Sequence, residues 1–394
     1  MEQIYDVAII GGGIIGSSTC VHLAEKDLNI ALINSPKSSP SATLASAGMI
    51  APFQLNGNSF LRDFSLKSFE YFLTFYNKIK DNTNIDLGFR QPGSLFLILS
   101  NLEIAKKEFE IKESRKVDPK ISFLNKQEVS KLEQNITKEI ISAYHFPQEA
   151  FINNIKFLKA IQSYISNKKV TLINNEVIQI SHSKEKVQSI KLDNGETIQA
   201  KKYLLTNGAW ANKLLKETFN QDVIKAVKGE ILEISVPIIP IQKIIFSSNG
   251  YIVPRPPTNQ FEKPKILIGS TSEEVNIENP NASKNTIEGV SCLINLYKEL
   301  LPNIKDSTIS NLWAGFRPAS SDGLPVIGKT TLENLYCGIG HYREGILWGP
   351  FTGKILAEII SEDTSEYNIE PFKFERFNRR GAPTERLYKT HIYS

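Results

Sequence analysis

The fold of this chain is decided by the stretch Ala8-Ile9-Ile10-Gly11-Gly12-Gly13-Ile14-Ile15-Gly16-Ser17-Ser18. Its apolar start predicts a short buried strand, and the residues after the glycines predict a helix that reaches about Glu25. Three glycines, Gly11, Gly13 and Gly16, stand at the G-x-G-x-x-G spacing. In this spacing the first glycine permits a tight turn, the second lets the backbone approach a pyrophosphate, and the third lets helix and strand pack closely.

The residues that follow strengthen this prediction. A second apolar strand, Asn29-Ile30-Ala31-Leu32-Ile33, comes directly after the expected helix. The N-terminus of that helix offers unpaired N–H groups and a partial positive charge. The unit therefore predicts a site for an adenine dinucleotide rather than a glycine-rich turn that binds nothing.

One position in this unit departs from the usual pattern. The second strand of such a unit ends in an acid that accepts hydrogen bonds from the adenosine ribose, and here the position holds Asn34. An amide oxygen also accepts from a hydroxyl, but it lacks the charge that strengthens the bond. Lys37 nearby would suit the 2′-phosphate of NADP, whereas the rest of the chain favours a flavin.

Composition limits the class of protein. The 394 residues are enough for two lobes, and the balance of 46 basic against 42 acidic side chains is too even for a nucleic-acid surface. No apolar run reaches membrane-spanning length, and the sequence starts with a strand rather than a signal peptide. We therefore expect a cytoplasmic enzyme with neither nucleic acid nor membrane as a partner.

The cysteines and histidines predict neither a disulfide framework nor a metal site. Cys20, Cys292 and Cys337 are widely spaced and odd in number, which is typical of small buried side chains in a reducing compartment. The five histidines show no metal-ligand spacing, so we expect no metal.

The middle of the chain predicts two interleaved lobes. Helical periodicity over 59–79, 102–115 and 151–167 alternates with short strands, and the buried strand from Lys202 ends in a turn as if returning to the first lobe. Helical periodicity returns over 286–301. Near the C-terminus, Gly349 and Pro350 suggest the N-cap and first position of a last helix that ends at about Ser361.

Several motifs together resemble the FAD-dependent glycine oxidases of the thiamine-biosynthesis type, within the D-amino-acid oxidase family. The resemblance spans about residues 5–377. Besides the glycine turn, its carriers are Ala45-Ser46-Ala47-Gly48-Met49, Val227-Lys228-Gly229-Glu230, Tyr251-Ile252-Val253-Pro254-Arg255, Trp313-Ala314-Gly315-Phe316-Arg317-Pro318 and Gly340-His341-Tyr342-Arg343 with Gly345-Ile346-Leu347.

The expected fold is α/β, with a Rossmann-like FAD-binding domain interleaved with an α+β substrate domain that is built on a mainly antiparallel sheet. We expect the FAD-binding domain in residues 1–85, 147–222 and 312–394, and the substrate domain in residues 86–146 and 223–311.

The resemblance implies an FAD site that extends along much of the chain. Backbone at Ile14 and Ile15 would lie by the pyrophosphate, following the glycine turn of Gly11, Gly13 and Gly16. The ribose would be held by Asn34 and Ser35, and the adenine would be contacted by the backbone of Val177. The edge of the flavin would be lined by Ala42, Thr43, Ala47, Gly48 and Met49. The pyrimidine end of its isoalloxazine would be wrapped by His341, Tyr342, Arg343, Glu344, Gly345, Ile346 and Leu347.

The resemblance also implies the catalytic residues. Arg317 would bind the substrate carboxylate, for which a planar bidentate guanidinium is well suited, with Tyr251 beside it. Arg343 would either assist with the carboxylate or brace its loop. Ser272 stands where we expect a bulkier apolar pocket residue.

The implied reaction is oxidation of glycine, sarcosine or a small D-amino acid to the imine, with O2 reduced to hydrogen peroxide. The imine would feed formation of the thiazole of thiamine. The alternatives are a dehydrogenase that passes electrons to a carrier, and a binding protein without catalysis. The family often forms tetramers, so a homo-oligomer is expected.

Overall fold

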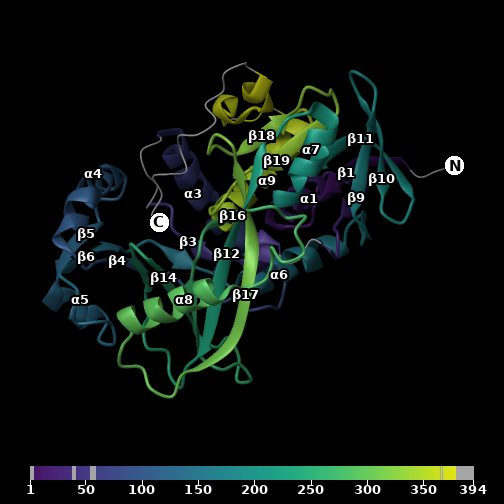
Figure 1. The fold of residues 1–394 in the computed structure, drawn as a ribbon. Helices are drawn as coiled ribbons and strands as arrows, with labels where there is room; N and C mark the ends of the chain where they lie inside the picture. The colour runs from purple at the N-terminus through teal and green to yellow at the C-terminus, as the bar shows by residue number, and fades with distance from the viewer. Residues whose placement is uncertain (1–3, 38–40, 54–58, 364, 366, 379–394) are drawn as a thin grey trace.

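The computed structural model describes residues 4–37, 41–53, 59–363, 365 and 367–378 (Figure 1). The parts of the expected domains at 1–3, 38–40, 54–58, 364, 366 and 379–394 lie outside the described residues. Within the described part, an eight-stranded sheet and a nine-stranded sheet hold most of the strands, and a two-stranded sheet joins β3 (Met49–Ile50) to β7 (Ala150–Phe151).

The eight-stranded sheet is built around the first strand of the chain. β1 (Ile4–Ile10) pairs in parallel with β2 (Ile30–Ile33) on one side and with β11 (Thr197–Leu205) on the other. The predicted return of the chain to its first lobe is therefore confirmed. The other strands of this sheet are β8 (Val170–Ile173), β9 (Val177–His182), β10 (Val187–Leu192), β18 (Val326–Lys329) and β19 (Leu335–Ile339).

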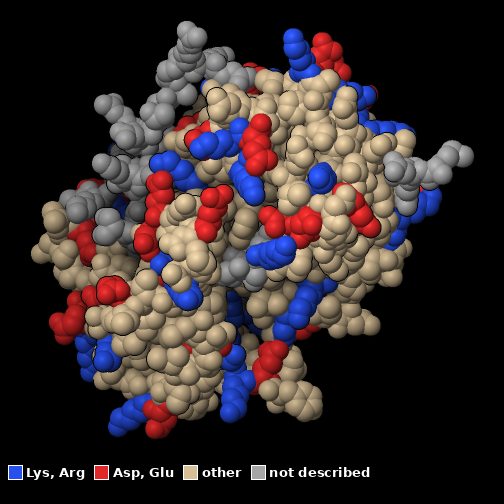
Figure 2. All heavy atoms as spheres, turned by 45° about the vertical axis from the view of Figure 1, so that its right-hand side comes forward, with Lys and Arg blue, Asp and Glu red and all other residues tan. Residues whose placement is uncertain are grey.

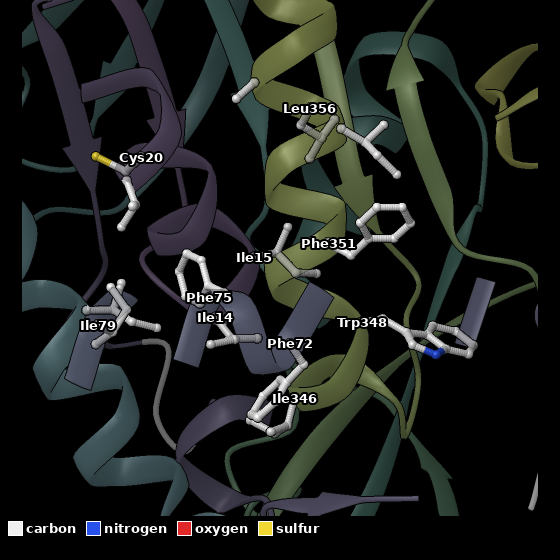
Figure 3. Packing of buried hydrophobic residues seen from close by; sticks show 14 of the residues in the cluster. Ile14, Ile15, Cys20, Phe72, Phe75, Ile79, Ile346, Trp348, Phe351 and Leu356 are labelled. Atoms are coloured by element: carbon white, nitrogen blue, oxygen red, sulfur yellow. The ribbon is translucent and has the colours of Figure 1, made fainter. Parts of the chain in front are cut away.

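Helices from distant parts of the chain pack together beside this sheet. α1 (Ile14–Ala24) lies against α9 (Gly345–Ile360), and Figure 3 shows side chains of both in one apolar cluster with Phe72 and Phe75 of α3 (Ser59–Asp81). A side chain at Gly353 would come within 2.7 Å of Ser18, so the two helices approach closely. α6 (Asn154–Ser166) also packs on α1.

Two predicted helix starts were wrong. α9 begins at Gly345, so Gly349 and Pro350 lie inside it; Gly349 instead lets α9 approach Ile14, whose side chain an added Cβ would meet at 2.9 Å. α6 begins at Asn154 rather than at about 151, because the Asn153 side chain accepts from the N–H of Lys156 and caps the helix. The remaining predicted helices are confirmed within two residues.

The nine-stranded sheet is mainly antiparallel, as predicted; the exception is the parallel pair of β4 (Ser94–Ile98) and β13 (Ile244–Ser247). Its longest pair is β12 (Ile224–Ser235) with β17 (Thr308–Ser320), which sets Val227 opposite Arg317. The other strands are β5 (Ser122–Asn125), β6 (Ser142–Phe146), β14 (Gly250–Arg255), β15 (Lys265–Gly269) and β16 (Glu273–Val275).

The remaining helices are short or lie on the outside of the sheets. They are α2 (Ala42–Ala45), α4 (Asn101–Val117), α5 (Lys126–Leu132), α7 (Ala211–Phe219), α8 (Ile287–Leu300) and the 3-10 turns Gly208–Trp210, Glu370–Phe372 and Phe374–Asn378. None of the helices among the described residues has both the length and the apolar composition that crossing a membrane requires.

Two expectations from composition concern the charge of the surface and the burial of the cysteines. On the face shown in Figure 2, Lys and Arg side chains are interspersed with Asp and Glu, so the described part of this face is not uniformly basic. Cys20 and Cys337 are buried as expected, whereas Cys292 is exposed on α8, contrary to the prediction.

Candidate active site

A cavity of about 1440 Å³ extends from the glycine turn after β1 to the strands of the nine-stranded sheet. Its volume exceeds the roughly 300–1,000 Å³ of an ordinary small-molecule pocket, as a dinucleotide requires. The predicted site residues that line it are Gly11, Gly13, Ile14, Ile15, Asn34, Ser35, Ala42, Thr43, Ala47, Met49, Val177, Tyr251, Arg317, His341, Tyr342, Arg343, Glu344, Gly345 and Ile346.

Three predicted cofactor residues, Gly16, Gly48 and Leu347, are not among the residues that line the cavity. Leu347 is fully buried in the apolar core beside α1. A Cβ at Gly16 would lie 2.0 Å from the carbonyl oxygen of Gly11, so Gly16 permits the close packing of helix and turn. Gly48 has a φ of +64°, and a Cβ there would lie 2.1 Å from the carbonyl oxygen of Ile152.

The nucleotide end of the cavity is formed mostly by backbone. Gly11 has a φ of +111°, and a Cβ there would come within 2.6 Å of the backbone of Thr206 and Asn207. The Ile14 N–H donates to Thr43 Oγ1 over 3.1 Å, which links the start of α1 to the short helix α2. The N-terminus of α1 thus opens onto the cavity with its positive dipole end.

Asn34 supports this turn directly. Its Oδ1 accepts from the Gly12 N–H over 3.1 Å, so the oxygen that we expected to serve a ribose hydroxyl already holds the glycine turn. Lys37 forms an exposed ion pair with Asp193, with 2.8 Å between Nζ and the carboxylate. That pairing gives Lys37 an acidic partner of its own, which weakens the case for a 2′-phosphate.

The small-residue segment at 42–49, which holds α2 and the start of β3, is held in place by side chains from three elements. Asn154 Nδ2 donates to the carbonyl oxygens of Thr43 and Leu44 over 2.7 and 3.0 Å. Trp313 Nε1 donates to the Ala45 carbonyl over 3.0 Å, and Arg255 donates to the Ala47 carbonyl. Burial lowers the pKa of Arg255 to about 10, so it remains a cation at neutral pH. The segment therefore forms a fixed wall of small side chains.

The opposite wall is the segment that leads into α9. His341 is buried, its Nε2 lies 2.8 Å from Thr352 Oγ1, and burial lowers its pKa to about 3, which keeps the imidazole neutral. Burial raises the pKa of the Glu344 carboxyl to about 7, although the positive charge of Arg343 acts in the opposite direction. The N-terminus of α9 also opens onto the cavity at Gly345.

Arg317 lies at the far end, on β17. Its Nη1 donates to the carbonyl oxygens of Lys228 and Thr271 over 3.3 and 3.1 Å, and its Nη2 donates to Ser270 Oγ over 2.6 Å. A Cβ at Gly229 would lie 2.0 Å from Nη2, so only glycine leaves room for the guanidinium on β12. Burial, and then the charge of Arg343, lower the pKa of Arg317.

Tyr251 reaches the same end of the cavity from β14. It is 7% exposed, and its ring packs edge-on against that of Phe246, with 6.3 Å between the centroids. A Cβ at Gly269 of β15 would lie 2.4 Å from the Tyr251 phenol oxygen, so this glycine makes room for the ring. Ser272, expected at the pocket wall, is exposed and does not line the cavity.

The residues present fit FAD. Two helix N-termini open onto one cavity, and the glycine cradle at its first end leaves no space for side chains. Asn207 Oδ1 is buried at the cavity wall and has no hydrogen-bond partner among the described residues, as expected of a polar group that serves a ligand. In the described part of the chain, His, Cys, Asp and Glu form no cluster of three that would hold a metal.

The comparisons with known proteins agree with this geometry. The family described as DAO, FAD dependent oxidoreductase, matches residues 6–359. The chain belongs to this family. Its cofactor is accordingly FAD.

Similar proteins cover nearly the whole chain. A bifunctional protein ThiO/ThiG of Trichormus variabilis is 28% identical over 386 residues, which are 96% of this chain and 56% of that protein. A glycine oxidase of Geobacillus kaustophilus is 26% identical over 381 residues, which are 95% of this chain and 98% of that enzyme. A crystal structure of glycine oxidase from the same organism superimposes with a TM-score of 0.86 at 25% identity, covering 94% of this chain and 98% of that one.

The chain spans little more than half the length of the bifunctional relatives that it matches. No motif pointed to several other residues that line the cavity, notably Ser270, Phe246, Lys159 and Lys213. The available signal was the apolar strand that ends before Asn207, Gly208 and Trp210. Because loops at the ends of parallel strands commonly contact a ligand, these three residues could have been predicted to line the cavity.

Proposed function

We propose that this protein is an FAD-dependent oxidase of glycine or another small amine such as sarcosine or a small D-amino acid. The observation that carries the proposal is the guanidinium of Arg317, which is fixed at the end of the FAD-sized cavity. Names of glycine oxidases among the relatives support the same substrate class.

Arg317 has donors left for a carboxylate. Of its five N–H groups, the two on Nη1 point to carbonyl oxygens and one on Nη2 points to Ser270. The second Nη2 proton and the Nε proton share the remaining edge, the arrangement that grips a carboxylate with two parallel hydrogen bonds. A substrate held this way has its α-carbon fixed within the cavity.

The other residues position the substrate and the charge. Bound FAD supplies the acceptor for the hydride that leaves the α-carbon. Tyr251 offers a hydroxyl donor beside the carboxylate. The N-terminus of α9 opens onto the cavity, where its N–H groups would stabilise the negative charge of the reduced flavin. Arg343, whose guanidinium lies 5.0 Å from the Tyr342 ring, either assists with the carboxylate or braces this loop.

The net reaction needs no acid–base pair. The amine substrate loses one hydride from carbon and one proton from nitrogen, which leaves a C=N bond, and O2 takes up two electrons and two protons to become hydrogen peroxide. His341 does not act as a base in this scheme, because it is neutral and bonded to Thr352.

We place the enzyme in the cytoplasm, with the imine supplied to the thiazole of thiamine. The resemblance to a family that often forms tetramers supports a homo-oligomer. The ThiO/ThiG names support the thiamine role. We assign residues 1–85, 147–222 and 312–394 to the FAD-binding domain, and residues 86–146 and 223–311 to the substrate domain. Parallel pairing of β1 with β11 supports this interleaving.

The test is a visible spectrum of the purified protein, followed by anaerobic addition of glycine, sarcosine and D-alanine. Bleaching of an oxidised-flavin band by one of them supports the proposal, and peroxide formed on readmission of air identifies an oxidase. Bleaching without peroxide would instead indicate a dehydrogenase that uses another acceptor. A flavin that none of the amines reduces would rule the proposed substrates out.

A further inference from the structure

Arg255 is the last residue of β14, and it belongs to a motif of which the proposed reaction uses only Tyr251. It is partly buried, and its guanidinium donates to the carbonyl oxygen of Ala47. A Cβ at Gly48 would lie 3.3 Å from Arg255 Nη2, so the guanidinium also reaches the next residue of that segment. Arg255 therefore lies directly against the backbone of residues 47–48.

The segment of residues 42–49 separates this guanidinium from the cavity. Ala47 and Met49 line the cavity, whereas Arg255 is not among the residues that line it. The resemblance to the glycine oxidases implies that Ala47, Gly48 and Met49 lie along the edge of the flavin. FAD bound in this way would have the charge of Arg255 behind one layer of backbone, on the wall opposite the N-terminus of α9.

The charge of Arg255 is not balanced by an acid. Among the described residues no carboxylate forms an ion pair with it, and Glu233, the acid whose charge acts on it, pairs instead with Lys265 over 2.8 Å. Its other contacts are neutral: the Pro254 carbonyl oxygen accepts from Nη1 over 3.5 Å, and the Phe151 ring lies 5.4 Å from the guanidinium carbon. An unbalanced charge in a partly buried site acts more strongly on its surroundings than a charge in water.

We propose that Arg255 is a positioning residue that holds a positive charge behind the wall of the flavin site, where it stabilises the negative charge that the flavin gains on reduction. This inference rests on the proposed function and deepens it. A hydride brings two electrons and one proton, so it leaves the neutral oxidised ring with one negative charge. A fixed cation nearby stabilises that charge, which raises the reduction potential and speeds the transfer.

The test uses sulfite, which adds to N5 of an oxidised flavin without any amine substrate. The lone pair of sulfur forms the new bond, and the ring takes up negative charge as it does on reduction. Arg255→Gln should weaken sulfite binding on the order of tenfold or more, the effect of removing a unit charge at intermediate dielectric. The matched control is Arg90→Gln, which removes an exposed cation that pairs with Asp86 and does not line the cavity; it should bind sulfite as the wild type does.

Arg255→Lys separates the charge from the hydrogen bonds of the guanidinium. A partly buried ammonium loses its proton more readily than a guanidinium does. The sulfite affinity of Arg255→Lys, divided by that of the wild type at the same pH, should therefore fall between about pH 6 and 10 toward the value for Arg255→Gln. The midpoint potential of the flavin should follow the same order. A residue that only held the segment in place would not produce this dependence on pH.

Wild-type affinity for sulfite in Arg255→Gln would overturn the assignment, as would an equal loss in Arg255→Gln and Arg255→Lys at every pH. If Arg255→Gln does not retain FAD, the pH series of Arg255→Lys decides, and an affinity ratio that does not change with pH overturns the assignment. Failure of the proposed function has a different signature, because sulfite binding would then depend on Arg255 as stated while none of the amines bleached the flavin.

Discussion

The two ends of the cavity are built in different ways. The nucleotide end uses backbone, where Gly11 and Gly16 bring β1, α1 and the strand end at Thr206 into close contact. The substrate end uses side chains, and Arg317 and Tyr251 come from strands of the other sheet. A site made of backbone depends on shape and tolerates exchange of its side chains, whereas a site made of side chains depends on the identity of each.

The largest expected effect comes from breaking the shape of the nucleotide end. Gly16→Ala would set a Cβ 2.0 Å from the carbonyl oxygen of Gly11, so α1 must move away from the turn. We expect a protein that does not retain FAD, measured by the flavin absorbance after desalting. Ser291→Ala, at an exposed position on α8, is the control and should stay yellow.

The next largest effect is expected from a substitution that changes the substrate end alone. Arg317→Ala should keep FAD, because Arg317 lies at the opposite end of the cavity from the glycine turn, but it removes two charged hydrogen bonds to the substrate. At about 1.5–3 kcal/mol each, their loss lowers kcat/KM for glycine by on the order of a thousandfold. Steady-state peroxide assays on the flavin-matched variant check this; activity near that of the wild type would exclude the clamp.

A pH effect is expected at Glu344, which lines the cavity at the N-cap of α9. Its folded pKa of about 7 lies above the ordinary value, so the protonated form is favoured by folding. This contribution to stability is complete below about pH 4.5 and is lost as the pH rises through 7. Thermal unfolding should show Glu344→Gln gaining on the wild type between about pH 4.5 and 7, with little further gain above that range. Parallel curves for the two proteins over this range would contradict the shift.

The smallest expected effect is a gain in FAD affinity from a substitution at the nucleotide end. Asn34→Asp supplies a charged acceptor at the ribose position while an oxygen stays within reach of the Gly12 N–H. Because charge-assisted hydrogen bonds are roughly twice as strong as neutral ones, we expect FAD to bind about threefold to tenfold more tightly. Fluorescence titration of the apoprotein with FAD measures this, and unchanged affinity would mean that Asn34 serves the turn only.

The same contrast explains how far the sequence could predict the structure. The glycine turn and its strands were predictable because spacing along the chain determines them. Ser270 was not, because its place beside Arg317 depends on the registers that join β15 to β12 and β12 to β17. The start of α9 was misplaced for a similar reason, since Gly349 serves a contact with Ile14 on another helix.

The pairing of α1 with α9 has a consequence for how the protein is made. The ribosome releases the glycine turn early, but the helix that covers it begins only about 330 residues later. At ~5–20 residues per second, that interval is roughly 15–70 s. The nascent chain therefore holds an apolar helix without its partner throughout that interval, and the cofactor site is complete only after α9 has been made.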